Sequence, residues 1–317
     1  MRESIGRVLH ITLYKCGSQW VKDILTAPEI VRCTQYPNAN ISFNTFMVGD
    51  FDFPAGKFSG PIYGMNKFEW ENFASPFDKA IVVMRDPRDR LISSLFSILN
   101  SHGTDHFIRL GRELLASFSE DRLRIIWMIL QASQFKRFYE TWNASSGPNV
   151  LIVRYEDLIN DTANEFKKIF SFLERDIPLV VLESVVERNS FERRSGRERG
   201  EESKFNHHRK GVAKDWEKYF TLEHGKLWET LYPGFLKDIG YESRNDWWKE
   251  LSKSATLLQS PQFSLSEVME KRNEFLECEI LAKENEIKRL VDICEERLDL
   301  IKLLDSELKK GKYVSGS

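Results

Sequence analysis

Two short segments of this chain combine residue types that suit an anionic ligand. The first is residues 14–20 (YKCGSQW), where a turn at Gly17 follows an apolar stretch and precedes a helix-forming one. Such a turn points several backbone N–H groups at one anion, and the helix N-terminus adds partial positive charge. Lys15 supplies a full charge at the same place. The GxxxxGK[ST] spacing of a Walker A loop is absent, so this segment alone is equally typical of an ordinary turn with a surface lysine.

The second segment begins at Arg85, which ends another apolar stretch. Pro87 follows at the expected first turn of a helix, and Ser93 lies eight residues after Arg85. A guanidinium and a nearby hydroxyl suit a phosphate group. We interpret Arg88 and Arg90, by contrast, as solvated charges on the helix surface. Together the two segments predict a site that holds a phosphate-bearing, anionic ligand between them.

The elements around these segments must bring them together. Three stretches are short, apolar and rich in β-branched residues, as buried strands are, and each precedes a helix-forming stretch. Alternating strands and helices predict an α/β fold, with three layers (α/β/α) around a central, mostly parallel sheet. Ligands of such sheets bind at the carboxyl ends of the strands, where Lys15, Arg85 and Tyr155 would lie. The predicted strands are residues 8–14, 79–85 and 149–155, and the predicted helices are 19–25, 87–99 and 163–173.

The composition argues against several other classes of protein. The 46 basic and 48 acidic side chains give a formal net charge of -2, so no global field attracts nucleic acid or a membrane surface. The four cysteines show neither CxxC spacing nor a dense framework, which argues against structural zinc or disulfides and favours a reducing compartment. We find no apolar run of about 18 residues that would predict a membrane span, and no signal-peptide pattern. We therefore expect a cytoplasmic protein without a bound metal.

The globular pattern ends near Tyr241, and a different pattern follows. We expect four regions, an α/β domain over residues 1–246, a linker over 247–263, a helical segment over 264–311 and a disordered tail over 312–317. Between Leu276 and Leu308 the apolar residues recur at alternating intervals of four and three, which is typical of a coiled-coil seam. This seam predicts a homo-oligomer held by the C-terminal helix. A solvated helix folded back onto the domain is the alternative.

Several motifs, taken in order, resemble those of the sulfotransferases that use PAPS (3′-phosphoadenosine 5′-phosphosulfate). Residues 14–20 resemble the 5′-phosphosulfate loop of that family, usually YPKSGTTW, but are one residue shorter, with Cys16 and Gln19 substituted. Residues 85–89 with Ser93 resemble its 3′-phosphate motif. The other matches are 153–158 (VRYEDL), 190–192 (SFE), 209–211 (RKG), 215–216 (DW) and 220–221 (FT). The resemblance covers about residues 8–241 and implies a P-loop NTPase-like sulfotransferase fold.

The resemblance also implies roles for single residues. Lys15 would contact the oxygen that bridges phosphate and sulfate, and would act in catalysis. The residues implied around the 5′ end of PAPS and its base are Cys16, Gly17, Ser18, Gln19 and Trp20. Those implied at the 3′ phosphate are Arg85, Ser93, Arg209, Lys210 and Gly211, and those near the adenosine are Tyr155 and Phe191. Taken singly, the aromatic residues would be interpreted as core side chains and the basic pair as solvated charges; taken together, the matches favour the donor site.

The general base is where the sequence departs from the family. Cytosolic sulfotransferases carry a KTH motif whose histidine accepts the proton of the acceptor, but Asn66 falls roughly at that position here. An amide cannot accept this proton, so we predict that Glu69, the nearest carboxylate, acts as the base. His102 and His106 are the alternatives.

The function implied by the resemblance is transfer of a sulfuryl group from PAPS to a hydroxyl or, as a second choice, an amine of a small-molecule or glycan acceptor. The C-terminal helix resembles coiled-coil appendages of bacterial glycan-assembly enzymes, which suggests a carbohydrate or glycolipid. A nucleotide-dependent kinase is one alternative, although Cys16 follows Lys15 where a kinase loop needs Ser or Thr. A non-catalytic scaffold that binds PAP(S) and acts through its coiled coil is the other, and the missing histidine keeps this alternative open.

Overall fold

The computed structural model describes residues 6–41, 43–44, 52–100, 106–118, 120–143, 147–198, 200–201 and 211–251, together with residues 273, 277, 280, 281, 284 and 288. The chain divides into two compact units, residues 1–103 with 118–260 and residues 104–117 with 261–317. The first unit contains the sheet and every predicted donor-site residue. Helix α5 (His106–Ser117) belongs to the second unit.

The first unit is built on a five-stranded sheet with the order β2-β3-β1-β4-β5, in which every described pair is parallel. The predicted strands are confirmed as β1 (Val8–Thr12), β4 (Lys79–Met84) and β5 (Val150–Arg154). The sequence did not predict β3 (Phe58–Tyr63) or β2 (Phe43–Asn44). Strand β1 is buried along its whole length, as expected of a central parallel strand covered on both faces.

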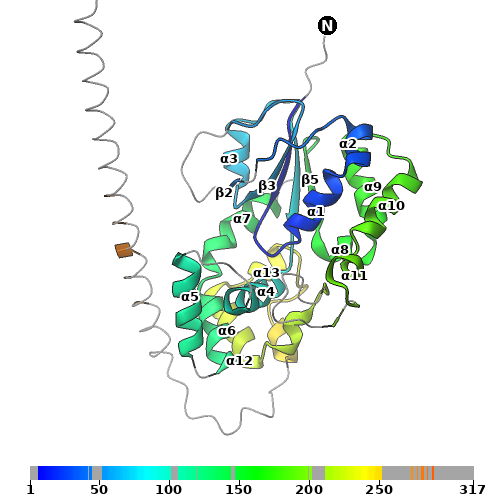
Figure 1. Ribbon diagram of the computed structural model, residues 1–317. Helices are drawn as coiled ribbons and strands as arrows, with labels where there is room; N and C mark the ends of the chain where they lie inside the picture. The colour runs from blue at the N-terminus through cyan, green and yellow to red at the C-terminus, as the bar shows by residue number, and fades with distance from the viewer. Residues whose placement is uncertain are drawn as a thin grey trace, which may run out of the picture. The chain divides into compact units, whose positions relative to one another are not determined.

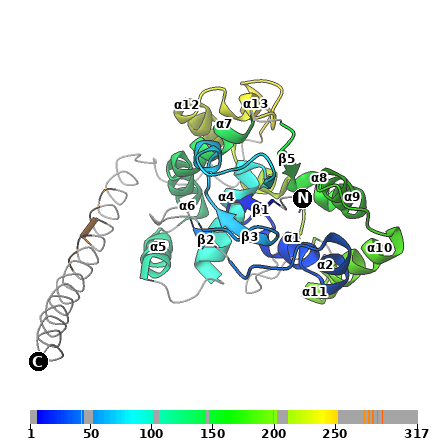
Figure 2. The same cartoon turned by 90° about the horizontal axis from the view of Figure 1, so that it is seen from above.

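Helices cover both faces of the sheet, so the predicted α/β/α layering is confirmed. Figure 2 shows α1, α2 and α10 on one side and α6, α7 and α12 on the other. The predicted helices are confirmed as α1 (Ser18–Leu25), α4 (Pro87–Asn100) and α9 (Thr162–Phe172). The others are α2 (Pro28–Thr34), α3 (Lys67–Glu71), α6 (Asp121–Leu130), α7 (Ser133–Asn143), α8 (Tyr155–Asn160), α10 (Leu179–Arg188), α11 (Phe191–Ser195), α12 (Leu222–Leu231), α13 (Phe235–Asp238) and the 3₁₀ turns η1 (Asp215–Lys218) and η2 (Trp247–Glu250).

The register places the carboxyl ends of four strands side by side. Thr12 at the end of β1 pairs with Tyr63 of β3 on one side and with Val83 of β4 on the other. Val83 in turn pairs with Val153 of β5. The segments that follow β1, β4 and β5 therefore leave the sheet at one edge, as Figure 1 allows the reader to follow. This edge carries the two predicted anion-binding segments.

The packed part of the first unit extends past the expected domain end at residue 246. Trp247 of η2 is buried, and its ring lies 5.6 Å from that of Trp216. The expected helical segment at 264–311 and the tail at 312–317 lie almost entirely outside the described residues, and the coiled coil stays a prediction. Among the described helices, none combines the length and apolar composition needed to cross a membrane.

Candidate functional site

The turn after β1 is shaped for close approach to a ligand. Lys15 and Gly17 have φ angles of 72° and 76°, in the left-handed region, and Gly17 is the N-cap of α1. A Cβ atom on Gly17 would lie 2.9 Å from a ring carbon of Tyr155, so only glycine fits there. The first backbone N–H groups of α1 begin at this turn, where they and the helix dipole favour an anion.

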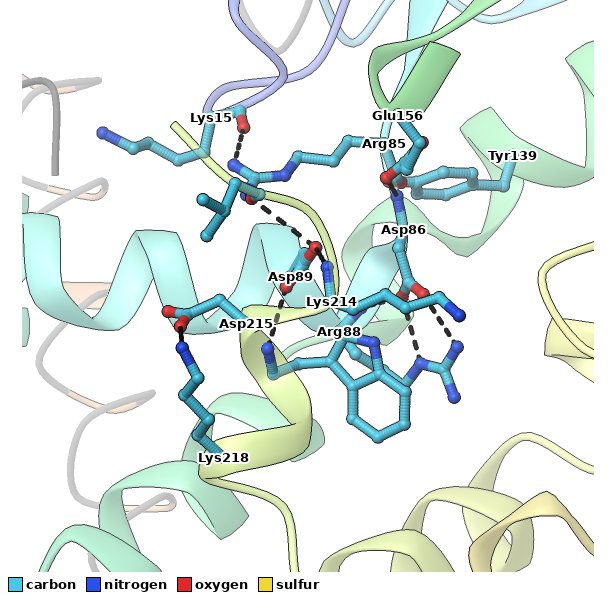
Figure 3. A network of polar contacts seen from close by, with 12 residues as sticks. Lys15, Arg85, Asp86, Arg88, Asp89, Tyr139, Glu156, Lys214, Asp215 and Lys218 are labelled. Atoms are coloured by element: carbon cyan, nitrogen blue, oxygen red, sulfur yellow. Dashed lines mark hydrogen bonds and ion pairs between the residues drawn. The ribbon is translucent and has the colours of Figure 1, made fainter. Parts of the chain in front are cut away.

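Arg85 joins this turn to a distant part of the chain. Its Nη1 donates to the carbonyl oxygen of Lys15 at 3.0 Å, and its Nη2 donates to that of Val212 at 3.2 Å (Figure 3). Its Nε is buried and has no hydrogen-bond partner among the described residues. Both hydrogen-bond partners of the guanidinium are neutral carbonyls. The Oδ2 of Asp89 lies 3.9 Å from its Nη2, so this carboxylate offsets the charge of Arg85 only in part. Such a guanidinium fits the phosphate of a donor nucleotide.

Asp89 fixes the segment that follows residue 210. Its Oδ2 accepts the backbone N–H of Lys214 at 2.7 Å, and its Oδ1 accepts that of Trp216 at 2.9 Å. Gly211 lies at the start of this segment, and a Cβ atom on it would meet the ring of Phe191 at 2.5 Å. The structure therefore brings two predicted donor-site residues, Phe191 and Gly211, into contact. Arg209 and Lys210 lie outside the described residues.

The side chain of Lys15 points to α4. Its Nζ donates to the hydroxyl of Ser97 at 3.0 Å. The predicted phosphate ligand Ser93 lies one helical turn earlier on α4 and is half-buried. No motif indicated Ser97, because the resemblance places a serine only at position 93. The structure thus adds a buried hydroxyl to the surroundings of the predicted catalytic lysine.

The other residues of the turn are brought together around Tyr155. The edge-on rings of Trp20 and Tyr155 have centroids 6.3 Å apart, and the guanidinium of Arg85 lies 4.5 Å from the centroid of Tyr155. The side chain of Cys16 is fully buried, and burial raises the pKa of its thiol. Cys16 can therefore offer a ligand only its backbone.

The interpretation of Arg88 and Arg90 as solvated charges is wrong. The side chain of Arg88 is only 2% exposed, and it donates to Asp86 and to Glu242. Its guanidinium lies 3.7 Å from the ring centroid of Trp216. Arg90 is also buried, with its guanidinium 3.4 Å from the ring centroid of Phe135. Two carboxylates and the ring of Trp216 offset the cost of burying Arg88, and the ring of Phe135 offsets part of that cost for Arg90.

Replacing Arg88 with methionine should lower the free energy of unfolding by about 3–5 kcal/mol, because the buried Asp86 carboxylate loses its charged partner. Urea denaturation followed by circular dichroism measures this change. Arg244→Met is the matched control, since Arg244 is 53% exposed and bonds Glu250 at the surface. We expect a loss below about 1 kcal/mol for the control. Equal losses in the two variants would contradict the buried network.

Glu156 hydrogen-bonds the backbone of Asp86, the residue after Arg85, and burial strongly raises the pKa of its carboxyl. Its Oε1 accepts the backbone N–H of Asp86 at 2.9 Å, whereas its buried Oε2 has no hydrogen-bond partner among the described residues. Burial raises the pKa of this carboxyl from 4.5 to about 7. Glu156 therefore titrates near neutral pH while it bonds the residue next to Arg85.

Glu156 should make the fold less stable as the pH rises from about 4.5 to about 7. The unfolded chain ionises this group near 4.5 and the folded chain only near 7, so its contribution to stability is complete below 4.5 and is then lost. The shift corresponds to about 3 kcal/mol. Urea denaturation at several pH values should therefore show that Glu156→Gln removes this decline.

Comparing Glu156→Gln with the wild type cancels the contributions of other titrating groups to the pH dependence of stability. Burial lowers the pKa of His10 to about 3 and that of His224 to about 4, so both histidines make stability rise as the pH increases to about 6.5. Their contributions are common to the two proteins. Glu183→Gln, an exposed position on α10, is the matched control. Parallel stability curves for wild type and Glu156→Gln would refute the shifted pKa.

The predicted base lies at the start of α3. Asn66 is the N-cap of this helix, and its Oδ1 accepts the backbone N–H of Glu69 at 3.1 Å. In return, the Oε2 of Glu69 accepts the backbone N–H of Asn66 at 2.6 Å. The two residues form a capping box, which gives both of them a structural role. The role of Glu69 as base stays a prediction. His102 lies outside the described residues, and His106 belongs to the second unit.

Tyr63, the last residue of β3, contacts the turn directly and was not predicted. Its hydroxyl lies 3.0 Å from the Oγ of Ser18 and accepts from the Nε2 of Gln19 at 3.2 Å. Its ring stacks on that of Tyr14, with centroids 4.0 Å apart and an interplanar angle of 14°. The residues before Tyr63 in β3 (FSGPI) form no continuous apolar run, so the sequence carries no clear signal for its place.

Comparisons with known proteins show that this chain is similar to sulfotransferases. A family model described as the sulfotransferase domain matches residues 68–240. A 3-alpha-hydroxysteroid sulfotransferase of Cavia porcellus is 25% identical over 259 residues, which cover 76% of this chain and 86% of that protein. Sulfotransferase 2A1 of Homo sapiens is 25% identical over 185 residues, covering 54% of this chain and 61% of that protein. The crystal structure of mouse sulfotransferase SULT7A1 complexed with PAP aligns with 78% of this chain and 88% of its own, at 18% identity and a TM-score of 0.49.

Proposed function

We propose that this chain, which belongs to the sulfotransferase family and is a PAPS-dependent enzyme, transfers the sulfuryl group to a hydroxyl of its acceptor. The family match spans more than half of the 317 residues. The observation that carries the donor site is the Arg85 guanidinium, which binds both the Lys15 turn and Val212 while its Nε stays unpartnered among the described residues. A nucleotide with phosphates at both ends would extend between these two segments.

The proposed contacts divide between the two ends of PAPS. The N-terminus of α1 and the turn that precedes it would hold the 5′ phosphosulfate, because their backbone N–H groups and Lys15 lie together. The proposed ligands of the 3′ phosphate are Arg85, Ser93, Arg209, Lys210 and Gly211. The rings of Trp20, Tyr155 and Phe191 would bind the adenosine. Two contacts support this proposal: Trp20 and Tyr155 meet edge-on, and Phe191 packs on Gly211.

The chemistry demanded of this chain is largely electrostatic. PAPS supplies the sulfuryl group and is left as PAP. As the acceptor oxygen bonds to sulfur, negative charge builds on the oxygen that stays with the phosphate, by analogy with phosphoryl transfer. We expect the ammonium of Lys15 and the N-terminus of α1 to stabilise that charge. Removing one such preorganised group typically costs about 10²- to 10³-fold in kcat.

The acceptor we propose carries a hydroxyl, with an amine as the second choice. A relative named for 3-alpha-hydroxysteroids supports an apolar alcohol. Within that class we propose a carbohydrate or glycolipid, because the C-terminal helical segment resembles the coiled-coil appendages of glycan-assembly enzymes.

Transfer of radiolabelled sulfate from PAPS to a hydroxysteroid, an alkyl amine and a simple sugar tests the proposed reaction. Labelled product from the steroid or the sugar supports a hydroxyl acceptor. Transfer to the amine alone would overturn that assignment. PAP binding without any transfer would favour the non-catalytic scaffold.

A further inference from the structure

Arg90 is a buried arginine without a carboxylate beside it. It lies near the start of α4 and is 4% exposed, and its guanidinium lies 3.4 Å from the ring centroid of Phe135 on α7. Its Nε is buried and finds no hydrogen-bond partner among the described residues. Burial lowers the pKa of Arg90. The groups whose charges act on it are those of Tyr139, Cys16 and Arg85, and none of them is a carboxylate.

Two other buried arginines of the same segment do have carboxylates beside them. The Nη2 of Arg85 lies 3.9 Å from Asp89, and the Nη2 of Arg88 lies 2.7 Å from Asp86. A guanidinium is always charged at neutral pH, and burying one without a counter-ion costs free energy. The ring that faces Arg90 offsets only part of that cost. The fold therefore holds an unbalanced positive charge at Arg90.

The charge of Arg90 acts on the turn that follows β1. The side chain of Cys16, in that turn, is fully buried. Burial raises the pKa of its thiol, and among the opposing charges Arg90 acts more strongly than Arg85. Arg85 in turn donates to the carbonyl oxygen of Lys15. Two buried guanidinium groups therefore act on the same turn, and their like charges oppose each other.

We propose, building on the proposed function, that Arg90 raises the affinity of the donor site for anionic nucleotides through its buried charge, without touching the ligand. Charges interact more strongly inside a protein than in water, because the surroundings screen them less. An anion bound beside the turn would offset the charges of Arg90 and Arg85 together. The protein thus gains affinity for a nucleotide with two phosphates but is less stable without it.

A purely structural role is the alternative, in which Arg90 stabilises the packing of α4 on α7 through Phe135. The two explanations predict changes of opposite sign when the charge is removed. A structural arginine stabilises the protein without ligand, so its loss lowers the melting temperature. An unbalanced buried charge destabilises the protein, so an apolar replacement of similar size raises the melting temperature.

Replacing Arg90 with methionine in the full-length protein tests the inference. We expect the melting temperature without ligand to rise by about 2 °C or more. In calorimetric titrations the Kd for PAP should increase about tenfold. The Kd for adenosine, which carries no phosphate, should change by less than about twofold, because an uncharged ligand does not interact with the lost charge. Arg90→Leu, with an apolar side chain of another shape, should give the same changes.

Arg137→Met is the matched control, since Arg137 is an exposed arginine of α7 that also lies over a phenylalanine ring, that of Phe68. It should change neither the melting temperature nor the Kd for PAP. A lower melting temperature in both Arg90 variants would assign Arg90 to packing and refute the inference. Wild-type affinity for PAP, or equal losses for PAP and adenosine, would refute it as well. A wild type that binds no PAP would instead overturn the proposed function.

Discussion

Replacing Arg85 with alanine should weaken the binding of PAP by about 10²-fold or more. The guanidinium bonds both the Lys15 turn and Val212, and its charge is only partly offset. Hydrogen bonds from a charged donor contribute roughly 1.5–3 kcal/mol each. Losing two such bonds from Arg85 to the phosphate of PAP would therefore weaken binding by this amount. Calorimetric titration with PAP measures it directly.

Two further variants identify the cause of the loss. Arg188→Ala removes an exposed arginine that bonds Glu29, and it should leave PAP affinity unchanged. Arg85→Lys keeps the charge but not the planar fork, so an intermediate affinity is expected. Thermal melting without ligand checks that Arg85→Ala is folded. A folded Arg85→Ala protein with wild-type PAP affinity would contradict the assigned phosphate site.

Replacing Lys15 with methionine should lower kcat by about 10²- to 10³-fold and weaken PAP binding by less than about tenfold. In the proposed mechanism the ammonium acts on charge that develops only as the sulfuryl group leaves, so the transition state should lose more stabilisation than the bound product does. Methionine keeps the length of the side chain, and both residues experience the same backbone strain at a φ of 72°. Steady-state kinetics with saturating PAPS give the kcat.

Lys136→Met provides the control for Lys15→Met. Lys136 lies on α7, where it pairs with Glu140 on the surface, and its loss should change neither kcat nor affinity. A Lys15→Met enzyme with unchanged kcat would show that the stabilising charge comes from elsewhere. Equal losses in kcat and in PAP affinity would instead assign Lys15 to ground-state binding.

The central part of the fold could be predicted because buried parallel strands are continuous apolar runs. Strands β1 and β4 have that character and were predicted, with β5 beside them. Strand β3 was missed because Ser59, Gly60 and Pro61 interrupt its apolar run, although the strand is buried throughout. Hydrogen bonds to β1 and burial in the sheet outweigh the weak local preference of these residues.

The proposed donor-site residues come from motif spacing, which gave no sign of the contacts that surround them. Turns after adjacent parallel strands meet at one edge, so Lys15 and Arg85 had to be close. The partner of Arg88, Glu242, is 154 positions away and carries no local signal, so a buried arginine resembled a solvated one. That Tyr63 and Ser97 lie beside the Lys15 turn follows only from the pairing of β3 with β1 and from the side of α4 that faces Lys15.

Titration of the wild-type protein with PAP, in buffer containing EDTA, tests the central claim most directly. A donor site built from a guanidinium, an ammonium and a helix N-terminus needs no metal to neutralise the phosphates, so we predict tight PAP binding under these conditions. ATP with Mg²⁺, titrated in parallel without EDTA, should bind much more weakly. Binding of Mg-ATP in preference to PAP would contradict the account and favour a kinase.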